Sequence, residues 1–152
     1  MGERPHYEAP EDRISEEEIA RLWASAGERK VKFFKLPTGP RYAIDFGFFH
    51  AGKLVAVAEV KDRTGWELRN GTVWLGASKV KELYEYDQLG IPAYFIVRLL
   101  GEIYFTQIDK RILDRDYYSI SWGGTTKRND PKDKEPCYNI PFGSLTKCIP
   151  QP

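Results

Sequence analysis

The sequence is short of the residues and segments that several classes of protein need. Its 152 residues include two cysteines and two histidines, and these (Cys137, Cys148, His6 and His50) form no zinc-ligand spacing. No apolar run approaches the roughly 20 residues of a membrane span, and the charged N-terminus lacks the apolar segment of a secretory signal. No G-x-x-x-x-G-K-[ST] phosphate loop occurs. We therefore expect a cytoplasmic protein with reduced cysteines, no membrane partner and no nucleotide triphosphate.

Charge is balanced overall but uneven along the chain. Hydrophobic residues make up 41% of the sequence and aromatic residues 14%, which is typical of a folded protein rather than a disordered one. The formal net charge is +1, yet the first 27 residues hold seven acids against three bases, whereas residues 28–82 hold 11 bases against six acids. The basic excess therefore surrounds the apolar stretch of residues 42–64.

Periodicity and turn residues predict a mixed sheet flanked by helices. Ser15 and Glu18 have the spacing of a capping box, so a first helix is expected over residues 16–26. Three strands should follow, and then, after a loop over residues 62–72, a second helix and two more strands. This order places the chain in the α/β (α+β) class. The strands are expected over residues 30–36, 41–50, 54–61, 93–99 and 102–108, and the second helix over 77–89.

The remaining residues give a weaker signal. Residues 116–122 and 137–142 are candidate short strands, and residues 123–136 have the composition of a mobile loop. The length of the chain is that of one domain with one core. We expect a single domain over residues 1–152, with a core over about 15–108 and a C-terminal extension over 109–152.

The stretch YAIDFGFFHAGKLVAVAEVKDRT (residues 42–64) raises the central question, because its apolar strands carry charged residues. A three-residue turn centred on Gly52 would pair residues whose numbers sum to 104. Asp45 then faces Glu59 across the hairpin. Lys61 shares their face, because side chains alternate along a strand. The hairpin therefore predicts a cluster of two carboxylates and one ammonium group.

Both faces of this hairpin are largely apolar, which is typical of strands in the middle of a sheet. The charged groups are therefore expected at the buried ends of central strands. The uncharged face is predicted to carry Ile44, Phe46, Phe48, Leu54, Ala56, Ala58 and Val60, and the charged face to carry also Phe49, Val55 and Val57.

Two carboxylates this close raise each other's pKa, and burial adds to the cost, unless a cation lies beside them. Mg²⁺ or Mn²⁺ would remove that cost, polarise a phosphoryl oxygen and lower the pKa of a bound water. We expect Asp45, Glu59 and the Val60 carbonyl to hold such an ion. The Lys61 ammonium would orient the water or stabilise charge on the phosphate. The cluster thus predicts phosphodiester hydrolysis, and the alternative is a structural ion-pair cluster in which Lys61 bridges the carboxylates.

The segments ID (Ile44, Asp45) and EVK (Glu59 to Lys61), with SEEEIARL before them and SKVKELYEY and IPAYFIV after, resemble the PD-(D/E)XK nuclease superfamily. The layout is similar to that of its small phage-type and Holliday-junction-resolvase-like members, over about residues 15–108. Ile44 stands where the proline of the motif would be. The resemblance implies a restriction-endonuclease-like αβββαβ core and Mg²⁺-dependent cleavage of DNA.

The resemblance also implies roles for individual residues. It makes Asp45 and Glu59 metal ligands and Lys61 the catalytic lysine. Resolvase-like members place a glutamate of the first helix at the site, and Glu16 matches it best. Glu17 and Glu18 are the alternatives for that glutamate, and Lys79 matches a position of the second helix where relatives carry Gln or Lys.

Other candidate contacts to DNA lie in loops. Aromatic side chains can stack on bases, and arginine and lysine can meet phosphates. Core packing is an equal alternative for Trp74, a solvated charge run is the alternative for the C-terminal loop, and His50 is expected to be merely exposed. The candidates are Arg63, Trp66, Arg69 and Trp74 after the catalytic lysine, and Lys127 and Arg128 in the C-terminal loop.

Two other functions fit the same resemblance. One is a nucleic-acid-binding module that keeps the fold without turnover, which the retention of Asp45, Glu59 and Lys61 disfavours. The other is a Holliday junction resolvase, which needs two sites on one symmetric particle and therefore a homodimer. The preference for single-stranded, duplex or branched DNA stays open.

Overall fold

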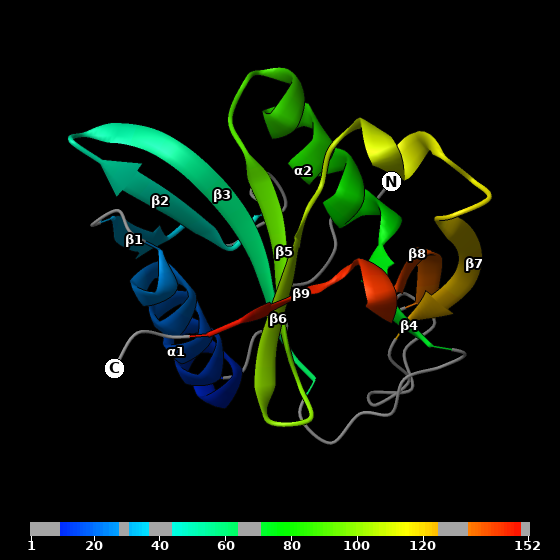
Figure 1. The fold of residues 1–152 in the computed structure, drawn as a ribbon, viewed down its shortest axis with the longest axis horizontal. Helices are drawn as coiled ribbons and strands as arrows, with labels where there is room; N and C mark the ends of the chain where they lie inside the picture. The colour runs from blue at the N-terminus through cyan, green and yellow to red at the C-terminus, as the bar shows by residue number, and fades with distance from the viewer. Residues whose placement is uncertain (1–9, 28–30, 37–43, 64–70, 125–133, 150–152) are drawn as a thin grey trace.

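The computed structural model describes residues 10–27, 31–36, 44–63, 71–124 and 134–149 (Figure 1). Its N-terminal elements are α1 (Pro10–Ala26), β1 (Lys32–Lys35), β2 (Phe46–His50), β3 (Lys53–Asp62), β4 (Thr72–Gly76) and α2 (Ala77–Gln88). Its C-terminal elements are β5 (Ala93–Leu99), β6 (Glu102–Gln107), η1 (Lys110–Leu113), β7 (Ser119–Gly124), β8 (Lys134–Pro141), η3 (Phe142–Ser144) and β9 (Thr146–Cys148).

The strands of the described residues form two sheets. The larger sheet has six strands in the order β1-β2-β3-β5-β6-β9, and the smaller has three in the order β4-β8-β7. In the larger sheet β3 and β5 run parallel and the other neighbours are antiparallel. The predicted mixed sheet is confirmed, and the predicted helices and strands of the core occur in the predicted order, with the unpredicted β4 between β3 and α2 (Figure 1).

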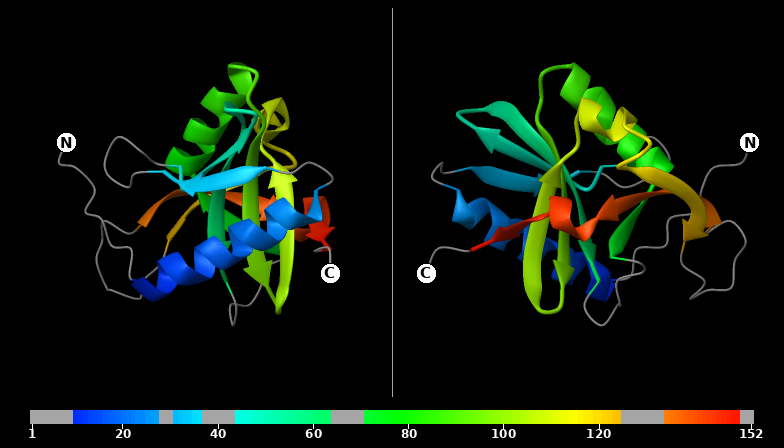
Figure 2. Two further views of the ribbon diagram at one scale, coloured as in Figure 1. Left: turned by 90° about the vertical axis from the view of Figure 1, so that its left-hand side faces the viewer. Right: turned by 45° about the vertical axis from the view of Figure 1, so that its right-hand side comes forward.

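Helices cover both faces of the large sheet (Figure 2). On one face, Ile19 of α1 belongs to the same buried cluster as Ile96 of β5. On the other face, Leu83 of α2 belongs to the same buried cluster as Val57 of β3. Each fully buried side chain of this size contributes about 1.5–3 kcal/mol to folding. Among the described residues, neither α1 nor α2 is long and apolar enough to cross a membrane.

The predicted start of the first helix at residue 16, with Ser15 as its cap, is wrong. The helix begins at Pro10, where proline's fixed φ suits the first turn and its missing N–H costs no hydrogen bond. Ser15 therefore lies inside α1, where its hydroxyl donates to Asp62 Oδ2 and accepts from Arg98 Nη2 at 2.9 Å. The spacing typical of a capping box instead reflects a tertiary contact between α1 and the sheet.

The hairpin of β2 and β3 has the predicted register at its inner end, but a different turn. Phe46 faces Ala58, as the sum of 104 requires, while His50 faces Lys53. The turn therefore has two residues rather than three, and both have positive φ (52° at Ala51 and 78° at Gly52), as in a type I′ turn. The register shifts beyond Phe48, so β3 has one extra residue there, and this β-bulge restores the predicted pairing.

The same bulge corrects the predicted faces. Leu54 packs against the cluster that contains Val57, and Val55 packs against the cluster that contains Phe46 and Phe48, so the two side chains have exchanged sides. Ile44, predicted to share the face of Phe46 and Phe48, also lies in the Val57 cluster because the chain has left the strand before β2 begins.

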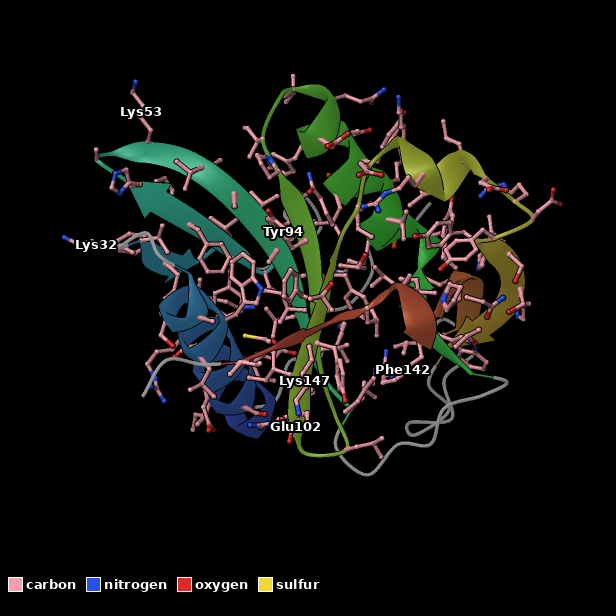
Figure 3. The ribbon with its side chains drawn as sticks, viewed as in Figure 1. Lys32, Lys53, Tyr94, Glu102, Phe142 and Lys147 are labelled. Atoms are coloured by element: carbon pink, nitrogen blue, oxygen red, sulfur yellow. The ribbon has the colours of Figure 1, made fainter. Side chains whose placement is uncertain are left out.

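The C-terminal extension is more ordered than its composition predicts. Residues 119–124 and 134–141 are strands, so both ends of the predicted mobile loop are paired, and residues 125–133 lie outside the described residues. Two strands were not predicted at all: β4, which pairs with β8, and β9, which joins the large sheet beside β6. Lys147 of β9 lies 3.7 Å from Glu102 of β6 (Figure 3).

Arg98 joins α1 to the end of β3, so its loss should measurably destabilise the fold. Arg98 Nη2 donates to Asp62 Oδ2 at 2.7 Å, and Nη1 lies 3.7 Å from Glu18 Oε1. We expect Arg98→Met to lower the free energy of unfolding by about 1–3 kcal/mol, since it takes the guanidinium from the partly buried Asp62 carboxylate, which keeps its hydrogen bond from Ser15. Arg111→Met is the matched control, because Arg111 pairs with Asp109 in solvent and should cost at most about 1 kcal/mol. Equal losses in urea denaturation would contradict this account.

Candidate active site

The candidate active site lies at the end of β3 where β2 no longer covers it. Asp45 directly precedes β2, and its Oδ2 accepts a hydrogen bond of 3.1 Å from the Val60 N–H of β3. A strand residue's N–H and C=O point to the same side, so the Val60 carbonyl also faces Asp45. On its other side β3 is paired with β5, with Glu59 facing Phe95 and Lys61 facing Val97. The hairpin thus brings Asp45 beside the Glu59 to Lys61 segment, as its register predicts.

Glu59 is the fully buried carboxylate of the site. Its side chain is fully buried, and within the part of the chain that the structure describes neither carboxylate oxygen has a hydrogen-bond partner. The ammonium groups of Lys61 and Lys79 lie 3.2 Å and 3.6 Å from Oε1. Burial, and then repulsion by Asp45, raise the pKa of Glu59 to about 7, although both lysines lower it. Glu59 is therefore a carboxylate that a further cation would stabilise.

Lys35 of β1 is the counter-ion of the other two carboxylates. Its ammonium lies 3.1 Å from Asp45 Oδ1 and 4.0 Å from Glu16 Oε2, and its side chain is 10% exposed. The sequence reasoning did not place Lys35 in the site. Strand alternation could have predicted this position. Lys35 lies two residues after the partly buried Phe33 in β1, so the two side chains share the face that packs against the core. The site therefore contains one more cation than the motif predicts.

Glu16 is the glutamate of α1 that the fold brings to this cluster. Burial is the largest cause that raises the pKa of Glu16, to about 8, and repulsion by Asp45 comes next, while Lys61 and Lys35 lower it. Glu18 instead reaches Arg98, and about half of its side chain is exposed. Glu16 is thus easier to protonate than an ordinary glutamate, although Lys35 and Lys61 favour its carboxylate form.

Lys61 reaches the cluster from the same face of β3 as Glu59. Burial disfavours its charged form, but the carboxylates of Glu59, Asp45 and Glu16 outweigh burial and raise the pKa of Lys61 above its ordinary value. The ammonium is therefore protonated at neutral pH. It can stabilise negative charge or orient a water molecule, but it cannot accept a proton.

The donor set fits a hard divalent cation in part. Among the described residues, no three His, Cys, Asp or Glu side chains share a point that could hold a metal ion. The reason lies in the lysines, since Lys35 stands between Asp45 and Glu16. Glu59 Oε2, which has neither an ion pair nor a hydrogen bond among the described residues, the spare lone pairs of Asp45 and the Val60 carbonyl are nevertheless the oxygen ligands that Mg²⁺ and Mn²⁺ prefer. These three residues fit one such ion.

The remaining candidates are placed by the structure or lie outside it. Arg63 continues from β3, its N–H donates to the Arg98 carbonyl at 2.9 Å, and burial lowers the pKa of its partly buried guanidinium. Trp74 of β4 covers Gly123 of β7, where an added Cβ would lie 3.1 Å from the indole, and His50 is exposed. Trp66, Arg69, Lys127 and Arg128 lie outside the described residues.

The elements around Asp45, Glu59 and Lys61 follow the αβββαβ order that the sequence resemblance implies, with β4 added before α2. The chain belongs to the family described as "Phage putative PDDEXK endonuclease", whose model matches residues 2–148. No curated protein matches the sequence. A solved structure of Hjc from Archaeoglobus fulgidus, described as a Holliday junction resolvase from an archaeal hyperthermophile, is 16% identical, with a TM-score of 0.48, covering 84% of this chain and 88% of that chain. Membership of this family therefore identifies the protein as a nuclease.

Proposed function

We propose that this protein is a cytoplasmic, metal-dependent deoxyribonuclease of phage type, and that Asp45, Glu59 and the Val60 carbonyl hold one Mg²⁺ or Mn²⁺ ion. The observation that carries the proposal is the fully buried Glu59 carboxylate, which lacks hydrogen-bond partners among the described residues and lies beside Asp45. Burial keeps the pKa of Glu59 raised to about 7 although Lys61 and Lys79 lie beside Oε1, so a further cation would stabilise its charged form. Membership of a PDDEXK endonuclease family supports DNA as the substrate.

The chain's own groups have distinct tasks in hydrolysis of the phosphodiester. A bound divalent ion supplies Lewis-acid polarisation of a phosphoryl oxygen and lowers the pKa of a water. The Lys61 ammonium, protonated through its carboxylate neighbours, stabilises the charge that develops on the phosphate as water attacks and the P–O bond breaks. Glu16, which burial makes easier to protonate, can give a proton to the leaving oxygen, and the attacking water releases its own proton to solvent.

Affinity for DNA would come mainly from phosphate contacts spread over the basic region. Such contacts are largely independent of sequence and weaken as salt rises. Lys79 of α2 is a candidate contact beside the proposed cleavage site, since its ammonium lies 3.6 Å from Glu59 Oε1. The other proposed contacts are Arg63, Trp66, Arg69, Lys127 and Arg128.

A second candidate function is a DNA-binding module without turnover, and one observation favours it. Lys35, Lys61 and Lys79 already pair with Asp45 and Glu59, so the cluster is also a plausible purely structural one. Incubation with single-stranded, duplex and branched DNA, in Mg²⁺, Mn²⁺ or EDTA, separates the two functions. A solution mass measurement tests the homodimer that a junction resolvase requires.

Loss of Asp45 should abolish cleavage through loss of the metal. We expect Asp45→Asn to reduce Mn²⁺ affinity and to cut DNA cleavage by at least about 10²-fold, with part of the activity restored by excess Mn²⁺. Asp116→Asn, a change to an exposed aspartate outside the cluster, is the matched control and should cleave like the wild type. Isothermal titration and a gel assay measure the two effects. Unchanged Mn²⁺ binding in Asp45→Asn would contradict its role as a ligand.

A further inference from the structure

Lys35 is a buried lysine held between two carboxylates of the site. Its ammonium lies 3.1 Å from Asp45 Oδ1, 4.0 Å from Glu16 Oε2 and 5.1 Å from the centre of the Phe46 ring. Its side chain is 10% exposed. Lysine is seldom buried to this extent unless its charge is compensated, and here both acidic partners belong to the candidate active site.

The backbone fixes Lys35 in this place. Lys35 faces Phe46 in the antiparallel pairing of β1 with β2. The N–H of the next residue, Leu36, donates to the Asp45 carbonyl at 2.7 Å, so Lys35 and Asp45 are tied together by main chain as well as by side chains. The sheet therefore fixes the backbone of Lys35 beside Asp45, so that the ammonium group is held within reach of both carboxylates.

The position of the ammonium divides the carboxylates into two sets. Asp45 Oδ1 and Glu16 face Lys35, whereas Glu59 faces Lys61 and Lys79 and keeps oxygens without hydrogen-bond partners among the described residues. A divalent ion placed between Asp45 and Glu16 would lie against a fixed positive charge, and like charges at such separations repel strongly in a poorly solvated site. On the side of Glu59 and Val60 an ion would meet the ammonium groups of Lys61 and Lys79, but these side chains are 34% and 23% exposed and can turn toward solvent, whereas Lys35 is 10% exposed.

We propose that Lys35 is a positioning residue that takes the place of a second metal ion. It holds Glu16 and Asp45 in position as a permanent counter-cation, and it limits the site to one divalent ion on the side of Glu59. This inference rests on the proposed metal-dependent nuclease, and it adds the number of ions the site takes and the residue that determines that number.

The test is the number of Mn²⁺ ions that the full-length protein binds, counted by electron paramagnetic resonance of free Mn²⁺ and by calorimetry. We expect one ion for the wild type, one for Lys35→Arg, and two for Lys35→Met, which removes the charge but keeps an apolar stem over Phe46. Lys32→Met is the matched control, because Lys32 lies on the same strand but points away from the molecule (Figure 3). It should bind one ion.

A second readout is the stability of the metal-free protein. Lys35→Met should melt at a lower temperature than Lys32→Met in EDTA, since Glu16 and Asp45 lose their counter-ion, and Mn²⁺ should restore most of the difference. Lys35→Arg should melt near the wild type. A loss in Lys35→Met that Mn²⁺ does not reduce would overturn the inference.

The outcomes separate this inference from the proposed function. Two ions in the wild type together with metal-dependent cleavage would overturn the inference and leave the nuclease intact. A single ion in Lys35→Met would overturn it as well. Absence of both Mn²⁺ binding and cleavage in the wild type would overturn the proposed function, and the inference with it. If Lys35→Met does not fold, the wild type and Lys35→Arg still test the proposal, because two bound ions in either protein would contradict it.

Discussion

Lys61→Ala should cleave DNA about 10²- to 10³-fold more slowly than the wild type while binding it almost as tightly. The rate should fall because a preorganised charge aimed at the reacting phosphate typically contributes this much, and the Lys61 ammonium stays protonated among its carboxylates. Affinity should change little because phosphate contacts are spread over many basic side chains. Single-turnover cleavage and fluorescence anisotropy with the same duplex measure the two quantities.

The control for Lys61→Ala is Lys81→Ala, an exposed position of α2, which should match the wild type in both assays. Equal cleavage by Lys61→Ala and wild type, in preparations free of contaminating nuclease, would remove Lys61 from the mechanism. Undetectable cleavage in both, with binding retained, would favour the DNA-binding module.

Glu59→Gln should abolish cleavage. In the metal-free protein it should also make stability less dependent on pH, because the wild type loses stability as pH rises. The pKa of Glu59 is raised from 4.5 to about 7, so the folded state binds more protons than the unfolded state between these values. Stability therefore falls as pH rises through this window, by about 3 kcal/mol for the single group. A glutamine is neutral at every pH, like the protonated carboxyl. The stability of the variant should therefore not fall through this pH window on account of residue 59.

Urea denaturation in EDTA at pH 5 and pH 7.5 tests the effect of Glu59→Gln on stability. The wild type should lose more stability across this interval than the variant, and Mg²⁺ should reduce the loss of the wild type because a bound ion compensates the charged carboxylate. Glu102→Gln, an exposed change on β6, controls for the amide in the cleavage assay and should remain active (Figure 3). Identical pH profiles for wild type and Glu59→Gln would show that burial of Glu59 carries no such cost.

The hairpin shows how far the sequence alone leads. Strand alternation and a glycine-containing turn place Asp45 beside Glu59 and Val60, because the turn sets the register of a hairpin that is apolar on both faces. The predicted turn was one residue longer than the observed turn, and the bulge beyond the pairing of Phe48 with Ala56 compensates for the difference. The register at the site could therefore be predicted, whereas the exact turn and the bulge depend on backbone geometry that composition does not encode.

Other features depend on contacts between distant segments and were missed for that reason. Lys35 reaches the site only because β1 pairs with β2, and the sequence contains many lysines that a strand could present there. Ser15 resembled a helix cap because its partners, Asp62 and Arg98, lie far away in the chain. The strands β4 and β9 are short, and their pairing with β8 and β6 gives no local periodic signal.

The small sheet has a consequence for the kinetics of folding. Thr72 faces Pro141 and Gly76 faces Cys137, so β4 pairs with a strand that lies more than sixty residues further along the chain. Closing so long a loop costs entropy before any contact is made, and such topologies typically fold over roughly milliseconds to seconds. The β2–β3 hairpin can form much earlier, but α2 packs against both β3 and β8. We therefore propose that core and extension form one domain that unfolds in a single transition, and that Lys79 reaches Glu59 only in the last step of folding.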